Sequence, residues 1–129
     1  METTKVITPY FENGVFAGVR VTLGDEDFVI APKDYQNGNE MPWQEAMDAL
    51  KADYLSTWNY RQICLTMAYR KEVDKVLVDN GGEILDNWYW TCAEYSAYYS
   101  FFCNGCNGTL DFNRKYSTYS VRPIKNLKK

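Results

Sequence analysis

The 129 residues, of which 46% are hydrophobic, suit one globular domain spanning 1–129, with a core that requires neither disulfides nor a metal. A net charge of −3 disfavours a general attraction to nucleic acid or to anionic lipid, since both reward clustered Lys and Arg. The absence of histidine removes the commonest metal ligand and the usual general base near neutral pH.

The N-terminus carries no targeting pattern. Residues 1–5 lack the apolar run of a signal peptide, and no stretch approaches the roughly 18 apolar residues of a membrane span. We therefore expect folding in the cytoplasm without a signal peptide or membrane segment, with the four cysteines as thiols. The lysines at 125, 128 and 129 are interpreted as a solubilising terminus.

Residues 14–31 predict a β-hairpin. Two runs rich in β-branched and aromatic residues, 15–23 and 28–30, flank a polar turn that begins at Gly24. Glycine followed by acidic residues between such runs is a hairpin signal.

Two helices are predicted next. Pro42 suits a first helical turn, and apolar residues recur at helical spacing up to about Lys51. A second helix is expected after Ser56 or Thr57, either of which could be its N-cap, and it extends to about residue 77 with a break near residues 69–70. The pair Gly81-Gly82 ends it.

The segment after Glu83 predicts a small antiparallel sheet. Strand-like runs at 88–92, 100–103, 109–112 and 120–124 are separated by Asn, Gly and Ser. The order of hairpin, two helices and sheet predicts the α+β class.

A C-x-x-C motif lies in this segment at Cys103 and Cys106. This spacing serves zinc binding or thiol–disulfide exchange, but structural zinc needs four ligands, and Cys64 and Cys92 do not form a second such pair. A redox motif usually opens a helix, whereas this one lies in an Asn/Gly turn. A redox or zinc protein therefore stays an alternative, and no cofactor or metal is predicted.

Aromatic residues are dense between 89 and 119, interleaved with Asn, Ser and Gly. Strand alternation buries some of them. The remainder have the composition of antibody-type recognition loops, in which Tyr supplies rigid amphipathic area. The segment therefore predicts a binding surface, and its acidic context disfavours single-stranded nucleic acid.

Several landmarks together resemble those of small C-type-lectin-like domains. The family patterns W-x-E-A, L-P-T, G-G, Y-W-S-S-x-E-Y and Y-V-R-P are similar to the runs at 43–46, 55–57, 81–82, 89–95 and 119–123. Ser56 stands where the family has proline, and Thr91-Cys92 where it has two serines. Bacteria and phages use such domains as adhesive modules and as variable proteins of diversity-generating retroelements.

The resemblance implies a C-terminal sheet whose contact residues vary on a stable scaffold. In the retroelement branch, miscopied adenines let AAC codons yield Tyr, Asn, Ser, Cys and others, but not Lys, Glu, Gln, Met or Trp. Between residues 95 and 119 only Lys115 belongs to that forbidden set, although average composition would place roughly a fifth of residues there. The cysteines of the C-x-x-C are then sampled side chains, whose replacement with serine leaves folding intact.

These observations predict a non-enzymatic protein that binds a ligand or receptor through residues 88–124. The partner is expected to be a protein or host-surface receptor. The protein could be a homo-oligomer or a virion subunit. It could be displayed on a virion or on a cell surface. The alternative is a structural interaction module of a virion or pilus assembly, with its aromatics buried against a neighbouring subunit.

The predicted division separates scaffold from contacts. Arg122 could pair with a buried carboxylate such as Glu94. The other scaffold residues are Trp88, Trp90, Val121 and Pro123. The predicted contact residues are Cys92, Tyr95, Ser96, Tyr98, Tyr99, Phe101, Cys103, Asn104, Cys106, Asn107, Asp111, Asn113, Tyr116, Ser117 and Tyr119.

Overall fold

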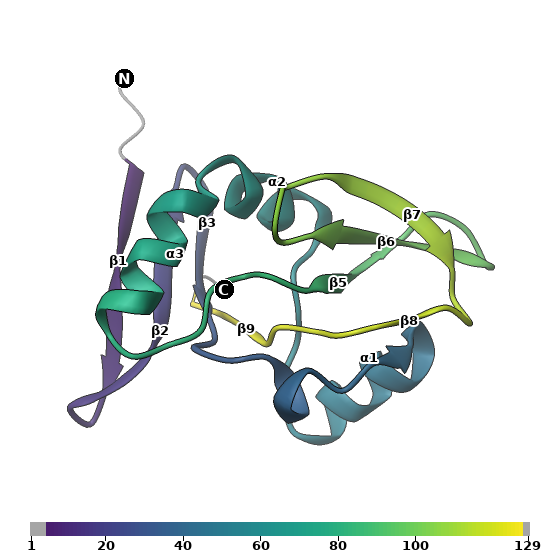
Figure 1. The fold of residues 1–129 in the computed structure, drawn as a ribbon, viewed down its shortest axis with the longest axis horizontal. Helices are drawn as coiled ribbons and strands as arrows, with labels where there is room; N and C mark the ends of the chain where they lie inside the picture. The colour runs from purple at the N-terminus through teal and green to yellow at the C-terminus, as the bar shows by residue number, and fades with distance from the viewer. Residues whose placement is uncertain (1–4, 128–129) are drawn as a thin grey trace.

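The computed structural model describes residues 5–127 and confirms the α+β class. Figure 1 shows a four-stranded sheet at one end and a three-stranded sheet at the other. The four-stranded sheet has the order β1 (Lys5–Glu12), β2 (Val15–Leu23), β3 (Glu26–Ile30) and β9 (Ile124–Asn126). The three-stranded sheet has the order β5 (Trp88–Glu94), β6 (Tyr99–Asn104) and β7 (Leu110–Arg114). Between them β4 (Met41–Pro42) pairs with β8 (Thr118–Tyr119).

The predicted hairpin is present as β2 and β3, which pair in antiparallel register. Strand β1 was not predicted. It contains Pro9, which lowers strand propensity but is tolerated here because β1 lies at the edge of its sheet. Helix α3 (Arg70–Asp79) packs against β1 and β2 and buries Val73 and Leu77 in their core.

The first helix, α1 (Trp43–Ala52), agrees with its prediction to within one residue. The second predicted helix is divided into α2 (Tyr60–Ala68) and α3, with the break at Tyr69 as expected. Gly81 adopts a φ of 83°, the left-handed conformation predicted for this helix end. Within the described range no helix is long and apolar enough to cross a membrane.

The predicted N-cap of the second helix was wrong. Asn59 caps α2: its side chain accepts from Gln62 N at 2.8 Å, and the Gln62 side chain accepts from Asn59 N at 3.0 Å. Ser56 and Thr57 instead donate to the carbonyl oxygens of Ile124 and Arg122, respectively. The two hydroxyls therefore tie the α1–α2 connection to the C-terminal segment.

The predicted strand at 120–124 was also wrong. Residues 120–123 cross from the β4–β8 pair to the four-stranded sheet, with β8 before the crossing and β9 after it. Backbone hydrogen bonds anchor residues 120–123 to the segment after β3: Tyr35 N donates to Val121 O, and Ala31 N donates to Pro123 O, both at 2.9 Å.

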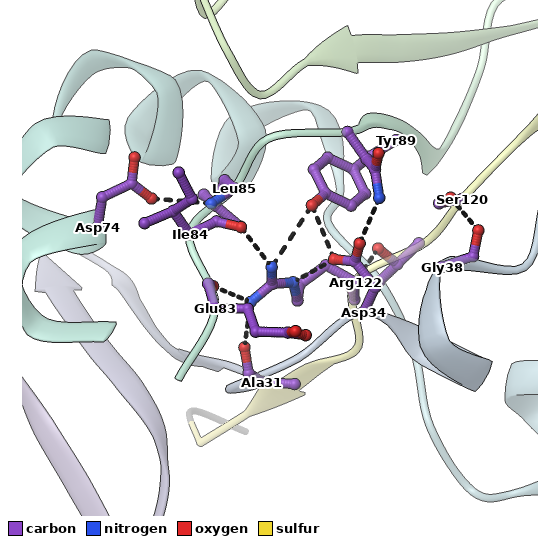
Figure 2. Close-up of polar contacts among 12 residues, drawn as sticks. Ala31, Asp34, Gly38, Asp74, Glu83, Ile84, Leu85, Tyr89, Ser120 and Arg122 are labelled. Carbon is purple, nitrogen blue, oxygen red and sulfur yellow. Dashed lines mark hydrogen bonds and ion pairs between the residues drawn. The ribbon is translucent and has the colours of Figure 1, made fainter. Parts of the chain in front are cut away.

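A buried arginine lies on this crossing (Figure 2). Arg122 Nε donates to Asp34 Oδ1 at 2.8 Å, and its Nη groups donate to the Tyr89 hydroxyl and to backbone carbonyls of residues 31, 83 and 84. These bonds satisfy all five N–H donors of the guanidinium. Burial raises the pKa of the Tyr89 hydroxyl, which therefore stays protonated and donates to Asp34 at 2.7 Å.

The expected Arg122–Glu94 pair was wrong. Glu94 lies at the surface, where its carboxylate pairs with Lys115 at 2.6 Å. Lys125, the first lysine of the predicted solubilising terminus, pairs with Glu12 at 2.9 Å. The N-terminal segment 1–4 and Lys128 and Lys129 lie outside the described residues.

Two apolar clusters meet at β5. Tyr89 belongs to the cluster between the four-stranded sheet, α2 and α3, whereas Trp90 belongs to the cluster around α1. Because consecutive strand residues point to opposite faces, one strand supplies both clusters. The three-stranded sheet is thereby fixed to both halves of the fold.

Candidate binding surface

The free end of the three-stranded sheet is formed by two turns, after β5 and after β7, at the end away from the four-stranded sheet (Figure 1). Backbone bonds fix these turns to each other and to α1. Lys115 N donates to Tyr98 O at 2.9 Å, and Trp43 N donates to Lys115 O at 2.8 Å. The Lys115 ammonium also lies 4.5 Å from the centre of the Trp43 ring.

One face of this sheet changes from core to surface along its length. Residues 99, 101 and 103 of β6 share this face and pair with residues 114, 112 and 110 of β7. Cys103 and Leu110 pack in the core beside α2, whereas Phe101 is half-buried and Phe112 is exposed. The same strand alternation therefore serves packing at one end and display at the other.

The displayed rings form a contiguous cluster, which we call the aromatic patch; it consists of Tyr60, Tyr95, Tyr99, Phe101 and Phe112. Tyr95 stacks on Phe112 with ring centres 4.1 Å apart and planes 2° apart. Phe101 meets Tyr60 of α2 edge-on at 5.1 Å and Tyr95 at 5.7 Å. Tyr99 meets Phe112 edge-on at 5.8 Å. The rings hold one another in place, so the patch is preorganised.

A groove of about 460 Å³ lies beside the patch. Its lining residues come from the two turns and the strand ends beside them, and are Ala97, Tyr98, Tyr99, Arg114, Lys115 and Tyr116. Tyr98 and Tyr116 are 77% and 68% exposed, so their rings form open walls. Tyr99 belongs to both groove and patch, which makes the two a continuous surface.

In comparisons with known proteins, no protein-family model matches the chain, and no curated protein matches it.

The predicted contact residues divide between two ends of β6. Near the free end lie Tyr95, Ser96, Tyr98, Tyr99, Phe101, Tyr116 and Ser117. Asn104, Cys106 and Asn107 lie at or beyond the opposite end, roughly 17 Å from Tyr99 along the strand. Cys92 is exposed within the irregular part of β5, where its N–H donates to Trp58 O. The structure therefore brings together only part of the predicted set.

Two predicted contact residues are buried, and their assignment to an exposed surface was wrong. Cys103 is 0% exposed and packs in the core with Tyr89. Tyr119 is 9% exposed and lies in the other cluster, where Trp90 meets its ring at 4.7 Å. Trp88, predicted as scaffold, is 49% exposed but stacks on Phe102 and Tyr119.

Several of the polar contact residues have local structural roles. The Ser96 hydroxyl accepts from the N–H groups of Tyr98 and Tyr99 at 3.2 Å. Asn104 and Asn107 accept from N–H groups two residues further on, both at 2.9 Å. Such side-chain bonds stabilise turns. Ser96, Asn104 and Asn107 therefore also stabilise the turns that were predicted to be recognition loops.

Asp111 and Asn113 lie on β7, an edge strand of the three-stranded sheet. The Asp111 carboxylate accepts from Phe112 N, and the Asn113 amide oxygen accepts from Arg114 N, both at 2.8 Å. Asn113 also donates to the Tyr119 hydroxyl at 2.7 Å. Two N–H groups that an added strand would need are thus already occupied.

Five residues of the patch and groove were not among the predicted contact residues: Tyr60, Ala97, Phe112, Arg114 and Lys115. Phe112 falls within the dense aromatic segment and could have been selected from it. Tyr60 carries no such signal, because it opens a helix far from that segment in sequence and reaches the patch only through tertiary packing.

The thiols of the C-x-x-C have unlike surroundings. Burial raises the pKa of the Cys103 thiol well above its ordinary value, whereas Cys106 is exposed and its thiol donates to Asp86 O at 3.1 Å. A redox pair needs an accessible thiol whose pKa is lowered. Among the described residues, no group of three or more Cys, Asp or Glu side chains could hold a metal ion.

Serine at position 103 is expected to lower the free energy of unfolding by about 1–3 kcal/mol, because it buries a hydroxyl in an apolar cluster. The Cys106→Ser variant is expected to change it by less than about 0.5 kcal/mol, since that side chain is exposed. Urea unfolding of both variants measures the difference. Equal effects would contradict the distinction drawn between the two cysteines.

Proposed function

We propose that this chain is a non-enzymatic binding protein with a C-type-lectin-like fold, and that it contacts a protein or host-surface receptor through the aromatic patch and the adjoining groove. Its surface is further proposed to be that of a retroelement-diversified variable protein, displayed on a virion or a cell.

The observation that carries this proposal is the aromatic patch itself. Tyr60, Tyr95 and Phe112 are exposed, yet their rings are ordered by contacts with Phe101. Exposed contiguous apolar surface marks interaction sites, and Tyr and Phe are enriched in interfaces. Preordered rings also lose little conformational freedom when a partner binds.

The positions of the family-like landmarks support the fold assignment. Trp43, Trp90 and Arg122 belong to the runs that resemble the lectin-like patterns, and all three are buried. Their polar groups are bonded: the Trp43 indole donates to Thr91 O and the Trp90 indole to Met41 O, both at 2.8 Å. These three residues of the resemblance are therefore parts of the buried scaffold.

The division between landmarks and variable-type residues supports the diversification proposal. The segment 95–119 supplies the two turns and most of the patch, while the buried landmark residues Trp43, Trp90 and Arg122 lie outside it. Ser100, Phe102, Cys103 and Tyr119 are exceptions, because they belong to that segment and are buried. Diversification at those codons would therefore be restricted by packing.

Sequencing the DNA around the gene tests diversification. The expected result is a near-identical repeat that differs from the coding copy at adenines, together with a reverse transcriptase gene. Differences between the two copies should fall on codons of the segment 95–119 and leave those of Trp90 and Arg122 unchanged. A locus without such a repeat would remove the retroelement part and leave the binding proposal standing.

A paired substitution, Tyr95→Ser with Phe112→Ser, tests binding. Fluorescently labelled protein is titrated onto intact cells of the community in which the gene occurs. The double variant is expected to bind at least about tenfold more weakly, because two interface aromatics are lost. The matched control is Val78→Ser, which removes an exposed apolar side chain of α3.

Two results would contradict the proposal: no cell type binds the wild-type protein, or the double variant binds as tightly as the control. Sedimentation equilibrium, which measures self-association, tests the alternative that the chain is a structural module of a larger assembly. A self-association abolished by the double variant would indicate that the patch packs against a neighbouring subunit.

A further inference from the structure

The groove beside the aromatic patch differs from it in charge. Two of its six lining residues, Arg114 and Lys115, are cationic, although the protein as a whole is acidic. The walls between them are tyrosine rings and Ala97. The groove therefore combines apolar ring surface with cationic side chains.

The two cations are not equivalent. Lys115 is already neutralised, because its ammonium lies 2.6 Å from a Glu94 carboxylate oxygen and over the Trp43 ring. Arg114 lies within ion-pair distance of no carboxylate of residues 5–127. Its guanidinium lies 5.7 Å from the centre of the Tyr116 ring, which orients it without cancelling its charge.

The hydrogen-bonding groups around Arg114 are arranged as donors. The guanidinium donates to the hydroxyl oxygen of Tyr116, and it also interacts with the hydroxyl of Tyr99. A phenol oxygen that accepts one bond still has its own O–H to donate, and a guanidinium has no acceptor. The groove therefore offers N–H and O–H donors to a ligand, and an ionised carboxylate is an acceptor-only group that fits them.

We propose that this groove binds an Asp or Glu carboxylate in an acidic peptide segment of the partner protein. Arg114 forms the ion pair, the hydroxyls of Tyr99 and Tyr116 donate to the carboxylate oxygens, and the exposed rings of Tyr98 and Tyr116 cover the adjoining methylene groups. The planar carboxylate matches the planar guanidinium, which can donate two parallel bonds to it. The volume of about 460 Å³ is that of a small-ligand site and accommodates a side chain with its neighbouring backbone. This assignment rests on the proposed binding function and names the chemistry of its partner.

The test uses two synthetic peptides, one of repeated Gly-Glu and one of repeated Gly-Gln, titrated into the ¹⁵N-labelled protein at low ionic strength. The Gly-Glu peptide is expected to shift the amide resonances of residues 97–99 and 114–116 and to be displaced by about 0.5 M salt, which screens exposed charges. The Gly-Gln peptide is expected to bind at least about fivefold more weakly, since its amide carries no charge.

Substitutions at Arg114 separate charge from geometry. Arg114→Gln is expected to weaken Gly-Glu binding by about fivefold or more, and Arg114→Lys is expected to fall between it and the wild type, because lysine keeps the charge and loses the fork. The matched control is Lys71→Gln, which removes an equal charge from an exposed position on α3 and should leave binding unchanged.

The carboxylate assignment is overturned if the Gly-Gln peptide binds equally well, if Arg114→Gln binds as the wild type does, or if the shifts lie elsewhere. A peptide of repeated Gly-phosphoserine that binds more tightly than the Gly-Glu peptide would replace the carboxylate with a phosphate. Cell binding that depends on Tyr95 and Phe112 but not on Arg114 would end this inference alone. Loss of the patch effect with retained peptide binding would end the proposed function instead.

Discussion

Replacing Arg122 with alanine is expected to lower the free energy of unfolding by about 3–5 kcal/mol. The substitution leaves Asp34 buried without its cation and removes the donors of three backbone carbonyls. Those carbonyls belong to residues 31, 83 and 84, so the link between the β3 end and the segment before β5 is lost along with the ion pair (Figure 2). Urea unfolding followed by tryptophan fluorescence measures the change.

Three further variants define what the arginine contributes. Arg122→Lys keeps the charge but cannot reach five acceptors, so most of the loss is expected to remain. Asp34→Asn is expected to destabilise less than Arg122→Ala, because the arginine keeps its carbonyl acceptors. The control is Arg20→Ala, which breaks a partly exposed pair with Asp27 at 2.7 Å and is expected to cost at most about 1 kcal/mol. Equal losses for Arg122→Ala and Arg20→Ala would refute the role assigned to the buried network.

Replacing Trp90 with alanine is expected to lower the free energy of unfolding by about 3–5 kcal/mol. The side chain is 0% exposed, contacts Phe102 and Tyr119 edge-on, and donates to Met41 O at 2.8 Å. Its loss opens a cavity between the three-stranded sheet and α1 and removes a buried hydrogen bond to the Met41 carbonyl.

The control for Trp90 lies two residues earlier on the same strand. Trp88 is 49% exposed, and its replacement with alanine is expected to cost about 1 kcal/mol from the lost stacking on Phe102 and Tyr119. Thermal unfolding of both variants compares them directly. A Trp88→Ala variant as unstable as Trp90→Ala would place the core of this half of the molecule elsewhere.

Local sequence patterns predicted the secondary structure better than they predicted which side chains form hydrogen bonds and ion pairs with each other. The spacing of apolar residues in α1 and the glycine after α3 are properties of short segments, and both predictions are confirmed. The prediction of the α2 N-cap failed because Ser56, Thr57 and Asn59, three polar residues within four positions, could each serve. Tertiary hydrogen bonds of Ser56 and Thr57 decided the choice in favour of Asn59.

Long-range contacts were beyond reach for a similar reason. Arg122 is 28 positions from Glu94 and 88 positions from Asp34, and nothing in the sequence favours the more distant carboxylate. The binding surface shows the same limit. Composition pointed to the segment 88–124 as a whole, and it could not separate Cys103 and Tyr119, which are buried, from exposed neighbours of the same residue types.

The bonded N–H groups of β7 have a consequence for how this surface can vary. The side chains of Asp111 and Asn113 occupy backbone N–H groups that another chain would need in order to pair with this edge strand. Their replacement by residues without a side-chain acceptor would leave these N–H groups free and create an aggregation-prone edge beside the patch. Of the residues that an AAC codon can reach, only Asn, Asp, Ser and Thr offer a short acceptor of this kind. Variants of this chain would thus be selected on two properties: recognition of the partner, and avoidance of aggregation through the edge of β7.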